Sequence, residues 1–121
     1  MKSSIITLSL FLTLASGLKE PNGKYCGNVI GNEIDITFYS NKDTSDITAT
    51  IFGSHYQCDN EKYSYNGDNK EIDMSSDPND CLNKVLEKYD LCPCPPNIKY
   101  DDTDNIIDVY TNLGDVSMKS C

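Results

Sequence analysis

The stretch IDITFY, residues 34–39, decides the fold, because its side chains alternate between apolar and polar. Ile34, Ile36 and Phe38 fall on one face of an extended strand, the pattern expected where one face is buried and the other meets water. The stretch ITATI, residues 47–51, repeats this alternation, and its β-branched residues favour a strand over a helix. We therefore predict a mainly β protein.

Weaker runs of the same kind follow, at residues 62–65, 71–74, 97–100, 106–110 and 116–119. Gly31-Asn32 and Asn66-Gly67 are typical of two-residue hairpin turns, and Gly53 predicts a bend or bulge within the run 47–58. Seven or eight short strands joined in sequence predict an antiparallel up-and-down meander that closes, or nearly closes, into a small barrel. A two-sheet sandwich is the alternative for the same pattern.

The inward-facing positions follow from the alternation within each strand. An eight-stranded barrel is barely wide enough for its own side chains, so we expect these residues to fill it and leave no cavity for a fatty acid. The predicted interior consists of Ile34, Ile36, Phe38, Ile47, Ala49, Ile51, Ile72, Met74, Ile98, Ile107, Val109, Val116 and Met118.

Residues from about 78 to 90 break the alternation and predict one α-helix. Asp77-Pro78 has the form of an N-cap followed by proline at the first helical position. We expect the helix to pack over an open end of the barrel or against the outer sheet, with a partner-binding helix as the alternative. Its apolar stripe consists of Leu82, Val85, Leu86 and Tyr89.

The start of the chain has the organisation of a secretory signal peptide. Lys2 is followed by an apolar run over residues 5–15 and by small residues at 15–17. We predict that residues 1–17 are a signal peptide and that residues 18–121 form a single secreted β domain. The apolar run is too short for a transmembrane helix.

Six cysteines follow this signal, and an even number in a short exported chain predicts a disulfide framework. If the sheet closes, the first and last strands become neighbours, so we expect a Cys26–Cys121 pair. The full set is Cys26, Cys58, Cys81, Cys92, Cys94 and Cys121.

The cysteines around the helix leave more than one interpretation. We expect Cys81 to pair with Cys92 or Cys94 and so to clip the helix at its ends. Pro93 argues against a Cys92–Cys94 bond, because it stiffens an already small ring. A zinc site made by Cys92, Cys94 and His55 is the competing interpretation, which the Cys-x-Cys spacing and export both disfavour.

The formal net charge is −9 at pH 7. Phosphate backbones require clustered cations, and anionic membrane surfaces repel a chain this acidic. We therefore predict no nucleic-acid partner and no membrane insertion.

No catalytic, metal or cofactor site is predicted. His55 is the only histidine, and the chain has no Gly-x-Ser-x-Gly nucleophile motif. Residues 102–105 begin like a calcium loop, but Ile106 and Ile107 stand where an oxygen ligand and a glycine are required, which favours a solvated turn. The tyrosines near the strands are assigned to half-exposed positions in preference to an interface.

The opening Gly23-Lys24-Tyr25 resembles the Gly-x-Trp start of lipocalin-like (calycin) barrels, with tyrosine in place of tryptophan. The resemblance covers this motif and the strand rhythm. It implies an up-and-down barrel that encloses a small apolar ligand. The predicted helix departs from the pattern, because it precedes the sixth strand and many lipocalins place theirs after the last strand.

Export, the disulfide framework and the lack of a catalytic constellation predict a secreted, non-enzymatic binding module that acts on another protein or surface. A small carrier of an apolar ligand is the alternative, and a small extracellular enzyme is the third hypothesis.

Overall fold

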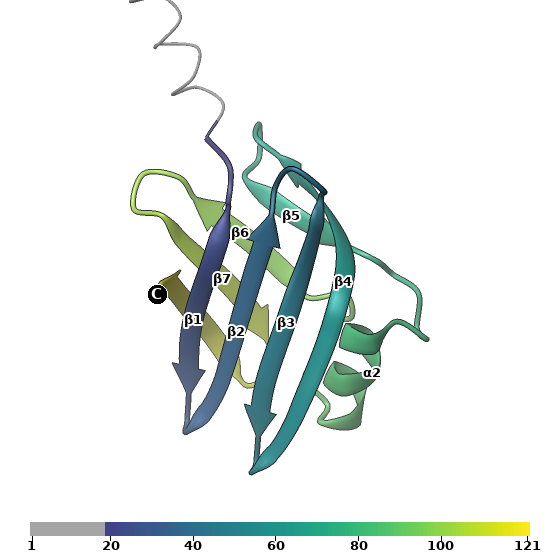
Figure 1. The fold of residues 1–121 in the computed structure, drawn as a ribbon. Coiled ribbons are helices and arrows are strands. Elements are labelled where there is room, and N and C mark those ends of the chain that lie inside the picture. Colours follow the sequence, from purple (N-terminus) through teal and green to yellow (C-terminus); the bar gives the residue numbers. More distant parts are fainter. Residues whose placement is uncertain (1–18) are drawn as a thin grey trace, which may run out of the picture.

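The computed structural model describes residues 19–121, so the predicted signal peptide lies outside the described residues. Eight antiparallel strands follow one another around a closed barrel, and β8 pairs with β1 (Figure 1). This confirms the predicted mainly β barrel with one helix. The elements are β1 (Gly23–Val29), β2 (Asn32–Tyr39), β3 (Thr44–Ile51), β4 (Ser54–Asn66), β5 (Glu71–Met74), α2 (Cys81–Lys88), β6 (Asn97–Asp101), β7 (Ile106–Thr111) and β8 (Gly114–Ser120).

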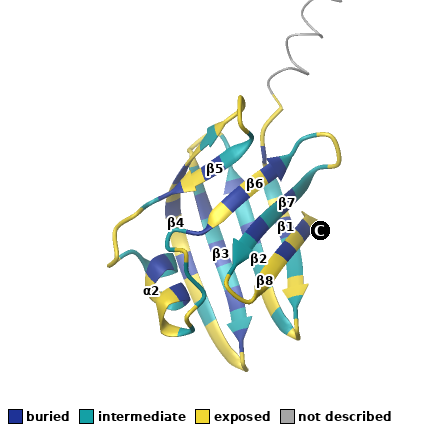
Figure 2. Ribbon diagram, turned by 180° about the vertical axis from the view of Figure 1, so that it is seen from behind, coloured by how far each residue is buried: buried dark blue, intermediate teal, exposed yellow. Residues whose placement is uncertain are grey.

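The strand register places the alternating apolar residues inside, as predicted. Ile36 lies opposite Ile47, and Val109 lies opposite Val116, each pair on the inner face. Every predicted interior residue is buried except Ile34, which is half-buried and packs against the core. Buried and exposed positions therefore alternate along the ribbons in Figure 2.

Asn66 pairs with Glu71, so the two-residue turn predicted at Asn66-Gly67 is a four-residue connection. Two other hairpin turns differ from their predicted positions. Gly53 does not bend a strand: Phe52-Gly53 is a two-residue turn between β3 and β4, with Ile51 opposite Ser54. The first turn is Ile30-Gly31, one residue earlier than predicted. A two-residue turn of this kind needs positive φ, which glycine adopts without strain, and both glycines have it.

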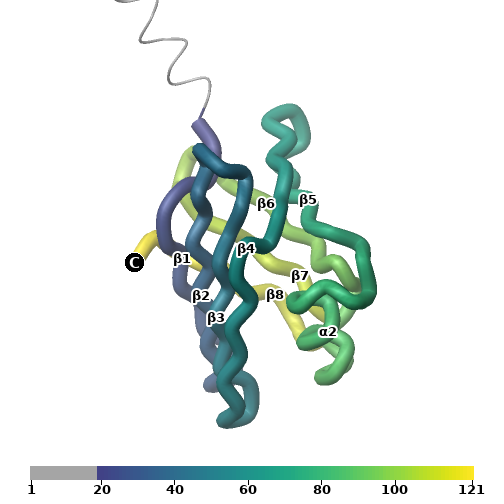
Figure 3. Tube along the Cα trace, turned by 45° about the vertical axis from the view of Figure 1, so that its right-hand side comes forward, coloured from purple at the N-terminus to yellow at the C-terminus, as the bar shows by residue number. Residues whose placement is uncertain are grey.

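The helix packs beside the part of β4 that has no strand neighbour on that side. β5 pairs with β4 only over Tyr63–Asn66, and α2 lies against the remainder of this 13-residue strand (Figure 3). The helix begins at Cys81, later than the predicted residue 78. Asp77 heads a separate turn in which its carbonyl accepts the Asp80 N–H at 3.0 Å, so Asp80 takes the N-cap position.

The disulfide framework is present, with one predicted pair confirmed and the others wrong. Cys26–Cys121 joins the first and last strands, as expected from barrel closure. Cys81 pairs with Cys58 of β4, because an eight-residue helix is about 12 Å long and holds its two ends too far apart for a bond. Cys92 pairs with Cys94; their Cα atoms are 4.6 Å apart, so the turn through Pro93 brings them together.

The tyrosines correct another expectation. Tyr25, Tyr63 and Tyr100 are buried in the core, not half-exposed. Their rings meet edge to face, with Phe38 between Tyr25 and Tyr63 and centroid distances of 5.8 and 5.1 Å. Among residues 19–121, no helix has the length and apolar character needed to cross a membrane.

Candidate functional site

The two ends of the barrel differ in how they are closed. At the end that carries the β2–β3, β4–β5 and β6–β7 turns, aromatic side chains seal the interior. The hydroxyls of Tyr25 and Tyr100 both donate to Asn105 Oδ1, at 2.6 and 2.8 Å, which ties the rings to the β6–β7 turn. We call this the sealed end.

The opposite end, beside α2, opens into an apolar cavity of about 80 Å³. Its walls are the inner faces of the strands and the apolar stripe of the helix, with Leu82, Val85 and Leu86 contributing from α2. Among the described residues that line it, only Asn32 and Thr111 carry polar side chains. We call this the helix end; its cavity can hold an apolar group but offers little to orient a polar one.

Three large apolar side chains stand exposed around this opening. Ile30, Phe52 and Leu113 lie at the tips of the β1–β2, β3–β4 and β7–β8 hairpins, and they are 82%, 69% and 56% exposed. All three also line the cavity. The exposed hairpin tips are visible at the lower end of Figure 2. We call these three residues the apolar rim.

Two rim residues hold a backbone conformation that suits neither of them. Ile30 has φ 49° and Phe52 has φ 48°, in the left-handed region where asparagine and glycine are favoured. A bulky side chain in this conformation lowers the stability of the fold by about 1 kcal/mol or more. Both side chains are exposed, so burial of apolar surface does not offset this cost. Strain of this kind, held at two positions of one surface, is typical of functional sites.

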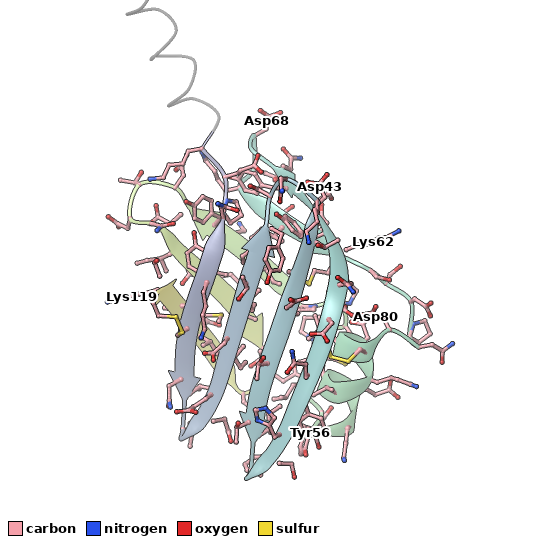
Figure 4. All side chains as sticks on the ribbon, viewed as in Figure 1. Asp43, Tyr56, Lys62, Asp68, Asp80 and Lys119 are labelled. Carbon is pink, nitrogen blue, oxygen red and sulfur yellow. A yellow bond between two sulfur atoms is a disulfide. The ribbon has the colours of Figure 1, made fainter. Side chains whose placement is uncertain are left out.

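A polar cluster adjoins the rim between β4 and α2. The hydroxyls of Tyr56 and Tyr89 contact each other, and the Lys88 ammonium lies 5.4 and 5.6 Å from the centres of their rings. The Tyr89 ring is 5.8 Å from that of Phe52. Figure 4 places Tyr56 at the helix end of β4, with Asp43 and Asp68 at the opposite end of the molecule. Contact with Tyr89 and Lys88 lowers the pKa of Tyr56.

A buried carboxyl group lies where β4 meets the start of α2. Glu61 is 5% exposed and pairs with Ser45 across the inner faces of β4 and β3. Burial, followed by the neighbouring Asp80 carboxylate, raises the pKa of Glu61 to about 8. The start of the helix is therefore covalently bound to β4 by the Cys58–Cys81 bond, and Asp80 lies next to the buried Glu61 carboxyl group.

The residues weighed as catalytic or metal-binding sites from the sequence do not line the helix-end cavity, whereas Leu82, Val85 and Leu86 of the helix stripe do. His55 is exposed on β4, and its Nδ1 lies 3.1 Å from Thr50 Oγ1. Cys92 and Cys94 are bonded to each other, and no group of three possible metal ligands occurs within residues 19–121. Asp101 Oδ1 accepts the N–H groups of the two residues at 103 and 104, which is the geometry of a solvated turn.

Sequence reasoning missed the apolar rim. Its signal was present as an isoleucine and a phenylalanine, each directly before a turn glycine, at Ile30-Gly31 and Phe52-Gly53. Comparison with protein-family models, with curated proteins and with solved structures found no match. The resemblance to lipocalin-like barrels therefore stays a prediction carried by three residues and the strand rhythm.

Proposed function

We propose that this protein is a secreted, non-enzymatic binding module that uses its helix end to hold an apolar side chain of a partner protein. The observation that carries the proposal is the apolar rim, which surrounds an open apolar cavity and includes two strained residues. Exposed apolar groups gathered at one opening are typical of interaction sites. Aliphatic walls can exclude water from a partner, but they supply no group that transfers a proton.

The size of the cavity favours an anchoring side chain over a whole small molecule. Pockets for drug-sized ligands measure roughly 300–1,000 Å³, and a cavity of roughly 150 Å³ accepts benzene. The cavity here is about 80 Å³ and open on one side, so it takes the tip of one apolar side chain. The rim then covers the surroundings of that anchor, which is the usual arrangement of an interface hot spot.

Secretion is supported by the predicted signal peptide and by three cysteine pairs, which persist in oxidising compartments. A carrier of a small apolar ligand is the second candidate, favoured by the nearly all-apolar lining of the cavity. Saturable one-to-one binding of a fluorescent fatty acid at low micromolar concentration, lost on Ile36→Trp or Ile51→Trp, would favour the carrier.

The test of the binding module is selection of peptides from a displayed random library on the folded, disulfide-bonded protein. We expect enriched peptides to share an apolar residue and to lose about tenfold or more in affinity on the double substitution Ile30→Asn with Phe52→Asn. Asparagine suits both turns, so this variant should unfold at a higher temperature than the parent. Loss of binding then cannot come from loss of fold.

The matched control is Asp43→Asn, which changes another residue of positive φ, at the sealed end. We expect it to leave peptide affinity unchanged. Enriched peptides that bind the rim variant as tightly as the parent would overturn the proposal, and so would a selection that enriches no peptide.

A further inference from the structure

Lys88 lies in a setting unlike that of an ordinary surface lysine. It is on the last turn of α2, and its ammonium lies 5.4 Å from the centre of the Tyr56 ring and 5.6 Å from that of the Tyr89 ring. The hydroxyls of these two tyrosines contact each other. These three side chains bring together one cation and two hydroxyls, one of which donates to the other. Tyr56 comes from the inner face of β4, so the cluster forms only where the strand and the helix end meet.

Lys88 has no carboxylate partner within the described part of the chain. The one ion pair among residues 19–121 joins Lys70 to Asp102, at the sealed end. Glu87 and Asp90 lie close to Lys88 along the chain, yet neither forms an ion pair with it. The hydroxyl of Tyr56 raises the pKa of Lys88, so the ammonium keeps its charge at neutral pH.

The cluster is continuous with the apolar rim. The ring of Tyr89 is 5.8 Å from both the Phe52 ring and the Tyr56 ring. Phe52 also lines the cavity, so the cavity is connected to the Lys88 ammonium through the Phe52 and Tyr89 rings. An ammonium beside this pair of phenols suits a carboxylate, because the ammonium and the hydroxyl that accepts from its neighbour can both donate a hydrogen bond to it.

We propose that Lys88, Tyr56 and Tyr89 bind a carboxylate of the partner protein, from an acidic residue beside the apolar side chain that enters the cavity. This rests on the proposed function, since the apolar anchor brings the carboxylate to the cluster. The net charge of −9 repels an acidic segment from the rest of the surface. Lys88, which adjoins the rim through Tyr89, therefore orients the partner segment on the rim.

Two N-acetylated, C-amidated dipeptides with the same apolar side chain test the carboxylate directly: leucyl-aspartic acid, which is an anion at neutral pH, and neutral leucyl-asparagine. Binding is followed through the backbone amide shifts of residues that line the cavity. We expect both probes to shift these residues and the anion to bind about fivefold more tightly at low salt. Molar salt should remove most of that preference.

Lys88→Gln should bring the two affinities together by weakening only the leucyl-aspartic acid probe. The matched control is Lys84→Gln, one turn earlier on the exposed face of α2, which should keep the fivefold preference. Equal affinities in the parent protein, or a preference that survives Lys88→Gln, would overturn the carboxylate site while the apolar site stands. If neither probe shifts the cavity residues, the proposed function fails as well.

Discussion

At the scale of single residues, two buried tyrosines differ in what their hydroxyl groups contact. The Tyr25 hydroxyl donates to Asn105, whereas the Tyr63 hydroxyl is buried with no hydrogen-bond partner. Burial raises the pKa of Tyr63 to about 12, which reflects the same dry surroundings. A buried donor without a partner costs more than the apolar group that replaces it.

We therefore expect Tyr63→Phe to raise the free energy of unfolding by about 1 kcal/mol and Tyr25→Phe to lower it by a similar amount. Urea unfolding of the two variants measures both changes. The reverse order would mean that the Tyr63 hydroxyl makes a hydrogen bond in solution.

Gly27 marks a close approach between β1 and β8. A Cβ at this position would lie 2.8 Å from Met118 Cγ and 2.9 Å from Val116 Cγ1, and both of these residues are buried. Gly27→Ala should lower the free energy of unfolding by about 1–3 kcal/mol, because the packed core must shift. The control is Gly67→Ala, where the new Cβ meets only Tyr65 at 3.9 Å and little change is expected. Equal effects of the two substitutions in thermal unfolding would contradict this packing argument.

At the scale of elements, the contact between α2 and β4 makes the free energy of unfolding depend on pH. The folded state raises the pKa of Glu61 to about 8, whereas an unfolded glutamate titrates near about 4.3. The folded protein thus binds this proton more tightly than the unfolded chain. Its contribution to the free energy of unfolding is present at low pH and is lost as pH rises through the interval between the two values.

We expect the melting temperature to fall between pH 5 and pH 8.5, and Glu61→Gln to flatten this dependence, because glutamine mimics the protonated carboxyl group. Lys70 lowers the pKa of Asp102, so Asp102 stabilises the fold when it is ionised. This contribution to the free energy of unfolding is lost only at more acidic pH and does not affect the interval in which Glu61 titrates. A parent protein whose stability rises over this interval would show that Glu61 ionises freely in the fold.

At the scale of the whole molecule, three cysteine pairs close loops of very different length. The sequence separations are 95 for Cys26–Cys121, 23 for Cys58–Cys81 and 2 for Cys92–Cys94. In the chain-entropy model a longer closed loop restricts the unfolded state more. Pairwise replacement by serine should therefore lower stability by about 5, 3 and 1–2 kcal/mol in that order. Urea midpoints would contradict the model if removal of the shortest loop cost most.

Full reduction should lower the melting temperature by well over about ten degrees, because the three bonds together are comparable to the stability of a small domain. All six cysteines are paired in the structure. Thiol titration of the native protein should accordingly find no reactive group, and two or more per chain would argue against the framework.

The sequence by itself determined the strands and the faces they bury, whereas closure of the sheet is shown by the structure, because the same strand pattern also allows a two-sheet sandwich. The reason is local, because successive side chains of a strand point to opposite faces of the sheet. The alternation within residues 34–39 therefore predicts which face is buried without any information from the rest of the chain. The apolar stripe of α2 was predicted in the same way, from apolar residues that recur at helical spacing. The pairing of Cys26 with Cys121 followed because closure brings the first and last strands together.

Only the tertiary structure decided where the ends of these elements meet. A bulge between Ser45 and Ile47 gives β4 one extra residue, which turns Glu61 inward although strict alternation from Cys58 would place it outside. Ile30, Phe52 and Leu113 are far apart in the chain and gather at one opening because three hairpins end there. Contacts of this kind depend on barrel closure and on the position of the helix, so they cannot be predicted from the local sequence pattern.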